Sequence, residues 1–164
     1  FIQIKLIFIS TLHTYKSTIT WTGNSGLGTT DYNPYERSHT ISVTNKADIL
    51  ASSDPGFRGD ASKHNPEELF LASLSSCHML WYLHLCSVAG ILVESYEDTA
   101  VGVMEETDNG SGKFIEVILY PIVTVSDTSM IEKAIAIHHE ANTMCFIANS
   151  CNFEVKHKPI VRTI

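Results

Sequence analysis

The sequence predicts an α+β fold in which antiparallel sheet covers two helices. Three observations lead to this prediction. Residues 65–90 form an apolar run that is long enough for about six turns of helix. Segments rich in β-branched and aromatic residues lie on both sides of that run, and a second stretch of helical periodicity follows Asp127. No repeat or linker interrupts the 164 residues, so we expect a single domain over residues 1–164.

The apolar run is the predicted central helix. Asn65 is suited to cap its start, Pro66 to its first turn and Gly90 to its end. A helix that is apolar on nearly every side is expected to be buried on nearly every side. A membrane span is the alternative interpretation, because about 20 apolar residues cross a bilayer. The serines and histidines within the run, and the lack of a basic flank, favour a protein interior.

Strands are predicted at residues 13–22, 38–43, 49–51, 91–104 and 113–125. A polar turn containing Asn109 and Gly110 joins the last two, which is a strong hairpin signal. The glycine cluster at 23–28 is interpreted as a turn, since no helix pattern or lysine follows that would make it a phosphate loop. Residues 153–155 and the last residues suggest a closing strand. Residues 1–12 are expected to form an extra strand or an irregular segment.

The second helix is predicted after Asp127, which can cap its start. Its apolar positions recur at helical spacing and form one stripe: Met130, Ala134, Ile137, Ala141 and Met144. Cys145 lies at the end of this stripe. We therefore expect Cys145 to point inward, toward the central helix.

The composition excludes some classes of partner and compartment. A net charge of −7 argues against nucleic acid, because phosphate binding needs a basic face. Four cysteines, Cys77, Cys86, Cys145 and Cys151, are too few for a disulfide-stapled secreted scaffold. We expect free thiols in a reducing compartment, the cytoplasm, with no bound cofactor and no membrane.

Cys77 lies in the middle of the central helix and can be inert filler or a reactive group. Free cysteine is among the most buried residue types, and Cys86, about half a turn round the helix, is interpreted as filler. Reactivity requires a thiolate, and a thiolate in an apolar site needs a cation or hydrogen-bond donors nearby. Cys145 could meet Cys77, but a disulfide requires Cα atoms within about 7 Å.

Two other kinds of site compete with a reactive cysteine. Cys77, His84, His138, His139 and Cys145 could gather around a metal, although the chain has none of the short Cys and His spacings usual in structural zinc sites. The other alternative is a non-catalytic dimeric domain that binds a hydrophobic ligand in a slot between the helices. Leu80, Trp81 and Met144 would line that slot, which would equally suit a bulky organic peroxide.

Three motifs carry a resemblance to a known family. Asn65-Pro66-Glu67-Glu68-Leu69-Phe70 followed by Ser75-Ser76-Cys77-His78 resembles the signature of the OsmC/Ohr family of thiol peroxidases, in its OsmC-like branch. Cys145-Phe146-Ile147-Ala148-Asn149-Ser150 is similar to the second cysteine motif of that family. Trp21-Thr22-Gly23 with Gly26-Leu27-Gly28-Thr29 is similar to its opening strand and turn. The resemblance covers roughly residues 13–160 and implies an intertwined homodimer with sheets wrapped around two central helices.

The resemblance also implies an antioxidant function in the stress response. Family members reduce organic hydroperoxides, and hydrogen peroxide is a further substrate to consider. Carried over to this chain, Cys77 is the peroxidatic thiol and Cys145 resolves its sulfenic acid as a disulfide, which a dithiol of lipoyl or other type then reduces. In the family an arginine balances the thiolate and a glutamate holds that arginine; the glutamate position is Glu67.

The arginine and the second motif depart from the better-known peroxidase branch. That branch carries its arginine in a glycine turn, and the turn at 23–28 has none. Arg37 is the residue we choose, and Arg58 is its rival. Because ten residues of straight helix span about 15 Å, Glu67 must act through an arginine, a break in the helix near 73–76 or a subunit interface. Phe146 stands where the branch commonly has proline, and Cys151 could compete with Cys145 as the resolving thiol.

Overall fold

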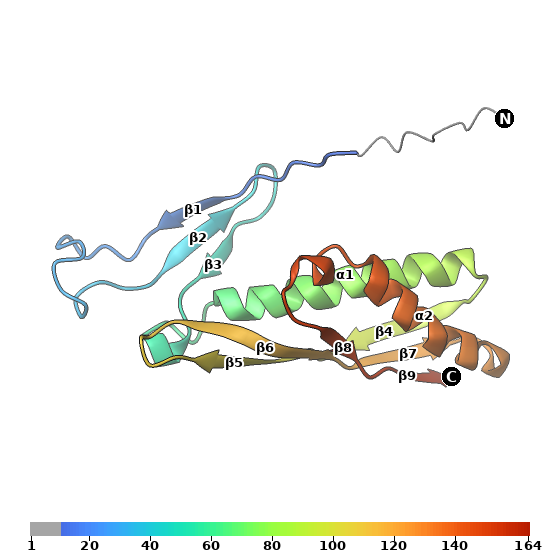
Figure 1. Cartoon of the computed structure of the whole chain (residues 1–164). Helices are drawn as coiled ribbons and strands as arrows, with labels where there is room; N and C mark the ends of the chain where they lie inside the picture. The colour runs from blue at the N-terminus through green and yellow to red at the C-terminus, as the bar shows by residue number, and fades with distance from the viewer. Residues whose placement is uncertain (1–10) are drawn as a thin grey trace, which may run out of the picture. The chain divides into compact units, whose positions relative to one another are not determined.

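A computed structural model describes residues 11–164, which form two compact units (Figure 1). One unit ends at Pro66, and the other runs from Glu67 to Ile164. The sequence predicted an extra strand or an irregular segment at residues 1–12. Residues 1–10 lie outside the described part of the chain, and Thr11 and Leu12 have no regular secondary structure. The single domain over residues 1–164 stays a prediction.

The first unit is built on a small antiparallel sheet. Its strands are β1 (Thr18–Trp21), β2 (His39–Ser42) and β3 (Ile49–Ala51), paired in that order. All three strands were predicted, although β1 is shorter than the predicted range. A short 3₁₀ helix, η1 (Pro55–Phe57), follows β3, and the Asp54 side chain caps it by accepting from the Gly56 amide at 2.6 Å.

The second unit contains the central helix α1 (Pro66–Val88), which is continuous and confirms the prediction. Gly90 ends it with a φ of 71°, a left-handed conformation that glycine adopts without steric cost. By length and composition α1 could cross a bilayer, a test that the core helix of a soluble protein also passes. Only one stripe of α1 is buried within the described chain: Leu74, His78, Tyr82 and Cys86. The expectation of burial on nearly every side was therefore wrong for the single chain, since Leu80 and Val88 are exposed.

Two three-stranded sheets support α1. The first has the order β4 (Val93–Asp98), β7 (Pro121–Val125) and β9 (Ile160–Thr163), and the second β5 (Val101–Glu106), β6 (Gly112–Leu119) and β8 (Val155–His157). The β5–β6 hairpin turns at Asn109-Gly110 as predicted. The pairings of β4 with β7 and β5 with β6 are antiparallel, whereas β8 and β9 add parallel to their neighbours. The sheets are therefore mixed, not purely antiparallel.

The two long predicted strands are each divided into two, so the ranges 91–104 and 113–125 were wrong as single strands. One division falls between β4 and β5, and the other at Tyr120, just before Pro121. Proline has no amide hydrogen to continue a ladder. Asp98 joins the two divisions, because its Oδ1 accepts from the Tyr120 amide at 2.7 Å. Each chain segment thus passes from one sheet to the other at this point.

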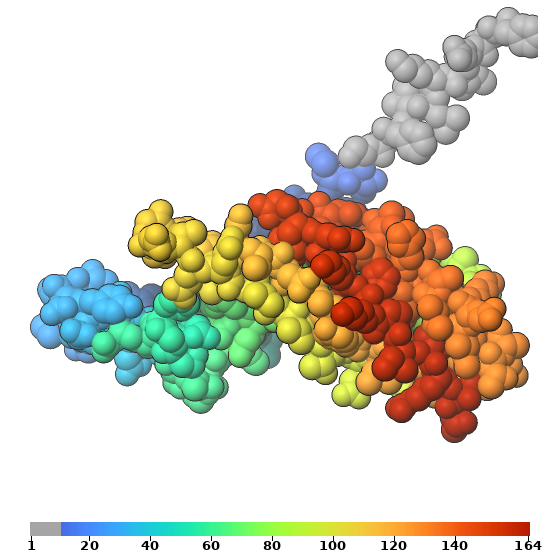
Figure 2. Space-filling model, turned by 60° about the horizontal axis from the view of Figure 1, so that its bottom comes forward, coloured from blue at the N-terminus to red at the C-terminus, as the bar shows by residue number. Residues whose placement is uncertain are grey.

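The second helix, α2 (Ile131–Met144), is preceded by the 3₁₀ turn η2 (Thr128–Met130). Asp127 caps η2, as its Oδ1 accepts from the Ser129 amide at 2.7 Å. The buried face of α2 consists of Ala134, Ile137, His138 and Ala141. A third 3₁₀ turn, η3 (Ala148–Ser150), connects α2 to β8, and Figure 2 shows α2 in orange beside the C-terminal strands in red.

The core of the second unit has two parts along α1. Leu74 packs with Val117, Leu119 and Val155 of the β5–β6–β8 sheet. Tyr82 and Cys86 pack with residues of β7 and with the buried face of α2. The predicted stripe of the second helix is confirmed for Ala134, Ile137 and Ala141, while Met144 is 41% exposed. Because both sheets hold α1, the side chains in its middle turns have fixed directions.

Candidate active site

Cys77 lies on α1 at the border between the core and a cavity. The cavity has a volume of about 600 Å³ and a mostly apolar wall. Cys77 is partly exposed, since the next residue, His78, takes the buried position. The residues that line the cavity are Ser73, Ser76, Cys77, Leu80, Trp81, His84, Phe146 and Ile147. A hydrophobic molecule in this cavity would therefore meet the Cys77 thiol.

Cys145 follows the last residue of α2 and is buried. Its sulfur accepts from the Ala148 amide at 3.4 Å, and its thiol lies near enough to that of Cys77 for the two groups to interact. Burial, followed by this contact with Cys77, raises the pKa of the Cys145 thiol to about 11. The structure thus brings the two predicted cysteines together, with Cys77 at the cavity and Cys145 behind it as a protonated thiol.

An aromatic wall closes one side of the cavity. The Trp81 ring meets Phe146 edge to face, with ring centroids 5.6 Å apart, and meets His84 at 5.8 Å. Leu80 and Trp81 line the cavity as predicted, but Met144 does not, since α2 ends at Met144 and the backbone changes direction at Cys145. Phe146 and Ile147 take its place, and their position next to Cys145 was the signal for them.

Glu67 lies at the start of α1, ten residues before Cys77. Since α1 has no break, Glu67 cannot reach Cys77 through a kink near residues 73–76, and that alternative was wrong. One carboxylate oxygen of Glu67, Oε2, is buried and has no hydrogen-bond partner among residues 11–164. A buried carboxylate oxygen is costly without a donor. Glu67 therefore has the capacity to hold a cation.

Arg37 belongs to the first unit, where two tyrosines surround its guanidinium. The group lies 4.4 Å and 4.1 Å from the ring centroids of Tyr32 and Tyr35, and donates to the backbone carbonyls of the same two residues. Arg58 lies over the Tyr32 ring at 5.6 Å. Both arginines line a polar cavity of this unit with a volume of about 520 Å³. The pairing of either arginine with Cys77 stays a prediction.

The other two cysteines have different surroundings. Cys86 is buried in the core beside Tyr82, and burial raises the pKa of its thiol. Cys151 is partly exposed and its thiol donates to the Ile147 carbonyl at 3.4 Å. Burial also raises the pKa of Cys151. Both thiols are therefore held in their neutral form at pH 7.

A histidine cluster lies in the core beside the cysteines. His78 of α1 and His138 of α2 are fully buried, and His78 Nε2 lies 3.0 Å from His138 Nδ1. His157 of β8 lies 5.6 Å from His78 and 6.3 Å from His138, measured between ring centroids. No periodic pattern in the sequence predicted this cluster. Within residues 11–164 no group of three or more His, Cys, Asp or Glu side chains could hold a metal ion.

Burial lowers the pKa of both histidines of this pair. The pKa of His78 falls to about 4, by burial and then by the charge of His157. The pKa of His138 falls to about 3, by burial and then by the charges of His78 and His157. Both rings are therefore neutral at pH 7.

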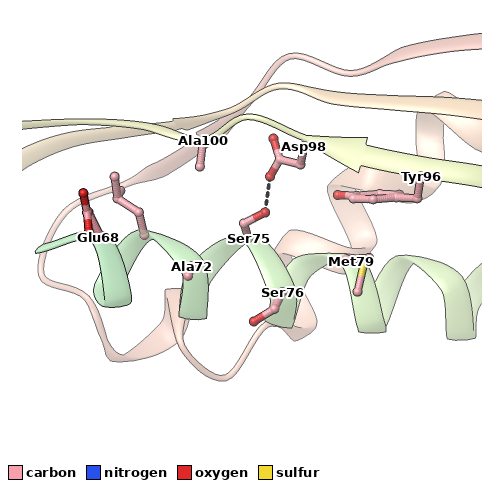
Figure 3. Close-up of a pocket in the computed structure, with 9 residues that line it drawn as sticks. Glu68, Ala72, Ser75, Ser76, Met79, Tyr96, Asp98 and Ala100 are labelled. Carbon is pink, nitrogen blue, oxygen red and sulfur yellow. Dashed lines mark hydrogen bonds between the residues drawn. The ribbon is translucent and has the colours of Figure 1, made fainter. Parts of the chain in front are cut away.

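A second cavity lies on another side of α1, between the helix and β4 (Figure 3). Ser75 donates to Asp98 Oδ2 at 2.5 Å, and the Tyr96 ring lies beside this pair. Burial, followed by the Asp98 charge, raises the pKa of the Tyr96 hydroxyl. Because Asp98 also accepts from the Tyr120 amide, it fastens the turn of α1 that precedes Cys77 to the sheets.

Comparison with known proteins shows the family of this chain. A model of the OsmC-like protein family matches residues 59–159. The chain belongs to the OsmC-like family. The predicted resemblance and the OsmC-like fold are thus confirmed. No protein with a curated description matches this OsmC-like chain.

Solved structures of OsmC-like proteins share the fold. An OsmC-like protein of unknown function from Vibrio cholerae is 36% identical, with a TM-score of 0.81, and the match covers 91% of this chain and 100% of that one. Organic hydroperoxide resistance proteins from Elizabethkingia anophelis and Legionella pneumophila are 23% and 19% identical, with TM-scores of 0.68 and 0.69. Each match covers 94% of this chain, and 99% and 100% of the respective structure.

The neutral histidine pair predicts acid sensitivity. In the unfolded chain both rings gain protons below about pH 6.5, whereas in the folded chain they resist until about pH 4 and 3. The free energy of unfolding is therefore highest above pH 6.5 and decreases as the pH falls toward those values, by at most about 1.4 kcal/mol per pH unit and histidine. Urea unfolding between pH 7 and 4.5 measures this slope. The double variant His78→Leu, His138→Leu should flatten it, and an unchanged slope would contradict the assignment.

Proposed function

We propose that this OsmC-like protein is a thiol-dependent peroxidase that reduces organic hydroperoxides, with hydrogen peroxide as a possible smaller substrate. The observation that carries the proposal is the contact between the thiols of Cys77 and Cys145 at the wall of an apolar cavity. Two neighbouring thiols can reduce a hydroperoxide to an alcohol and water, and are themselves oxidised to a disulfide, without a cofactor. The family membership and the hydroperoxide resistance proteins of the same fold support this choice.

The reaction has three steps. The Cys77 thiolate attacks the terminal oxygen of the hydroperoxide and the O–O bond breaks, so that Cys77 becomes a sulfenic acid while the alkoxide leaves and takes up a proton from solvent to give the alcohol. The Cys145 thiol attacks the Cys77 sulfur, water leaves and a disulfide forms. An external dithiol then reduces this disulfide through a mixed disulfide and restores both thiols. The apolar wall from Leu80 to Phe146 would hold the organic group of the substrate.

A guanidinium is the cation that the proposed thiolate requires. We assign this role to Arg37, with Arg58 as its rival, and assign to Glu67 the role of holding the arginine. A guanidinium is always charged and can bond a carboxylate and a thiolate at once. The unpartnered, buried oxygen of Glu67 supports this assignment. Cys151 is left outside the mechanism, because its thiol is bonded to the Ile147 carbonyl.

A homodimer completes the proposal. Large apolar side chains are exposed in the single chain. They include Leu80 of α1, at 63%, and Phe146, which follows α2, at 69%. Exposed apolar patches of this kind mark interaction sites in soluble proteins. We place the dimer in the reducing cytoplasm, where the cysteines stay reduced between turnovers.

The first test separates the roles of the cysteines. Cys77→Ser should abolish hydroperoxide consumption with a dithiol reductant, because serine forms no sulfenic acid. Cys145→Ser should allow one turnover and accumulate a sulfenic acid that dimedone traps. Cys151→Ser is the matched control and should retain the wild-type rate. Equal rates in all variants would refute the peroxidase and favour a domain that binds a hydrophobic ligand in the same cavity.

The second test separates the two arginines. Replacing the arginine that pairs with the thiolate by methionine should slow hydroperoxide consumption by roughly tenfold or more, because the variant loses a hydrogen bond to a charged group. The loss should shrink at alkaline pH, where the thiol ionises without help. We expect this behaviour from Arg37→Met and a near wild-type rate from Arg58→Met. The reverse result would transfer the role to Arg58.

The third test concerns the dimer. Leu80→Glu places a charge on the exposed face of α1, where it should weaken an apolar interface and leave a monomer fold intact. Sedimentation velocity should show a dimer for the wild type and a shift toward monomer for Leu80→Glu. Leu92→Glu, at a residue that is 57% exposed after the end of α1, is the matched control. A wild-type monomer at micromolar concentration would contradict the proposed dimer.

A further inference from the structure

The hydrogen bond between His78 and His138 joins the two helices that supply the reactive cysteines. His78 adjoins Cys77 on α1, and His138 precedes Cys145 by seven residues, about two turns of helix. His138 and Ala141 lie three residues apart on the buried face of α2, Cys145 follows four residues later directly after the helix, and all three are buried. One hydrogen bond thus joins the two helices, and the two thiols lie near each other beside it.

The pair is a costly way to fill a core. In a neutral pair one ring donates and the other accepts, so one further N–H remains, on His78 Nδ1 or on His138 Nε2. Neither of these two atoms has a hydrogen-bond partner among the described residues. Two apolar side chains of similar shape would avoid this cost. Selection for stability therefore does not explain the pair, whereas a geometric role does.

The surroundings fix the two rings in place. Tyr82 of α1 stacks on His138, with ring centroids 3.9 Å apart and planes inclined by 16°. The titratable groups that face the pair are His157 of β8, Tyr82 of α1 and Tyr96 of β4. His139 and Glu154 act on His157, and Asp98 acts on Tyr96. No carboxylate among the described residues acts on either ring of the pair to compensate an added proton.

We propose that the His78–His138 hydrogen bond is a positioning clamp that keeps the thiols of Cys77 and Cys145 in contact and thereby sets the rate of disulfide formation. The inference rests on the proposed function for its biological use. The clamp touches no reacting atom. It acts in the step in which the Cys145 sulfur attacks the Cys77 sulfenic acid, the new S–S bond forms and water leaves. The clamp requires at least one neutral ring to accept the hydrogen bond, so two added protons release it.

The experiment measures the Cys77–Cys145 disulfide without peroxide. Purified protein is equilibrated with reduced and oxidised dithiothreitol, and the linked peptide pair is quantified after alkylation and digestion. His138→Phe keeps the ring and removes the hydrogen bond, so it should lower the equilibrium constant for the disulfide by about fivefold. His138→Asn offers a side-chain group near the position of Nδ1 and should restore most of the loss. His139→Asn, at the exposed neighbour on α2, is the matched control and should equal the wild type.

A second readout separates positioning from a general loss of structure. In a single turnover with excess hydroperoxide, the sulfenic acid should form at the wild-type rate in His138→Phe and convert to the disulfide about fivefold more slowly. If His138→Phe does not fold, His78→Phe with His78→Gln as its rescue variant provides the same comparison. Unchanged equilibrium constants in both Phe variants, or an equal loss in His139→Asn, would overturn the clamp. A wild type that forms the disulfide with dithiothreitol but consumes no hydroperoxide would refute the proposed function alone.

Discussion

The packing of one stripe of α1 against two sheets is the constraint on which the site depends. Leu74, His78, Tyr82 and Cys86 recur every four residues and are all buried. Cys77 precedes a member of this stripe, so it is turned by about 100° from the core and reaches the cavity wall. A shift of α1 by one residue would bury Cys77 and expose His78. The same stripe that stabilises the fold therefore also decides which thiol meets a molecule from solvent.

The connection between the two sheets makes this placement firm. Asp98 lies where the chain passes from β4 to β5, and it accepts hydrogen bonds from the Tyr120 amide and the Ser75 hydroxyl. The Asp98 carboxylate thus links the place where both long strand segments divide to the turn of α1 just before Cys77. The hydrogen bond to the helix and the apolar stripe fix the helix about its axis from two directions.

Much of the fold could be predicted from local patterns, and the motifs indicated that Cys77 and Cys145 would lie near each other, while the roles of Glu67 and Arg37 stay predictions. The apolar run between Asn65 and Gly90 predicted α1 closely, because its end signals are local. The hairpin at Asn109-Gly110 was equally local. The division of the long strands was not predicted, because apolar periodicity continues through Tyr120 while the pairing partner changes. The parallel addition of β8 and β9 depends on contacts distant in sequence, which periodicity does not encode.

The histidine pair was missed for a related reason. His138 was predicted only as a candidate metal ligand, because the spacing of a histidine along a helix does not show whether its ring has a buried partner. His78 is part of the first cysteine motif, but its partner lies 60 residues away. Conversely, the predicted slot residue Met144 lies outside the cavity, because the helix ends at Cys145 and the chain direction changes there.

The difference in burial between the two cysteines gives the proposed reaction its order. Cys77 borders a cavity, whereas Cys145 is buried and its pKa is raised to about 11, so Cys145 remains a thiol at pH 7. A protonated, buried thiol is a poor nucleophile toward a peroxide in solution. It becomes useful only when an electrophilic sulfur is formed in contact with it, and the Cys77 sulfenic acid is such a group. The closeness of the two sulfur atoms then compensates for the low nucleophilicity of the Cys145 thiol. The rate of disulfide formation therefore depends more on the position of α2 relative to α1 than on the pKa of Cys145.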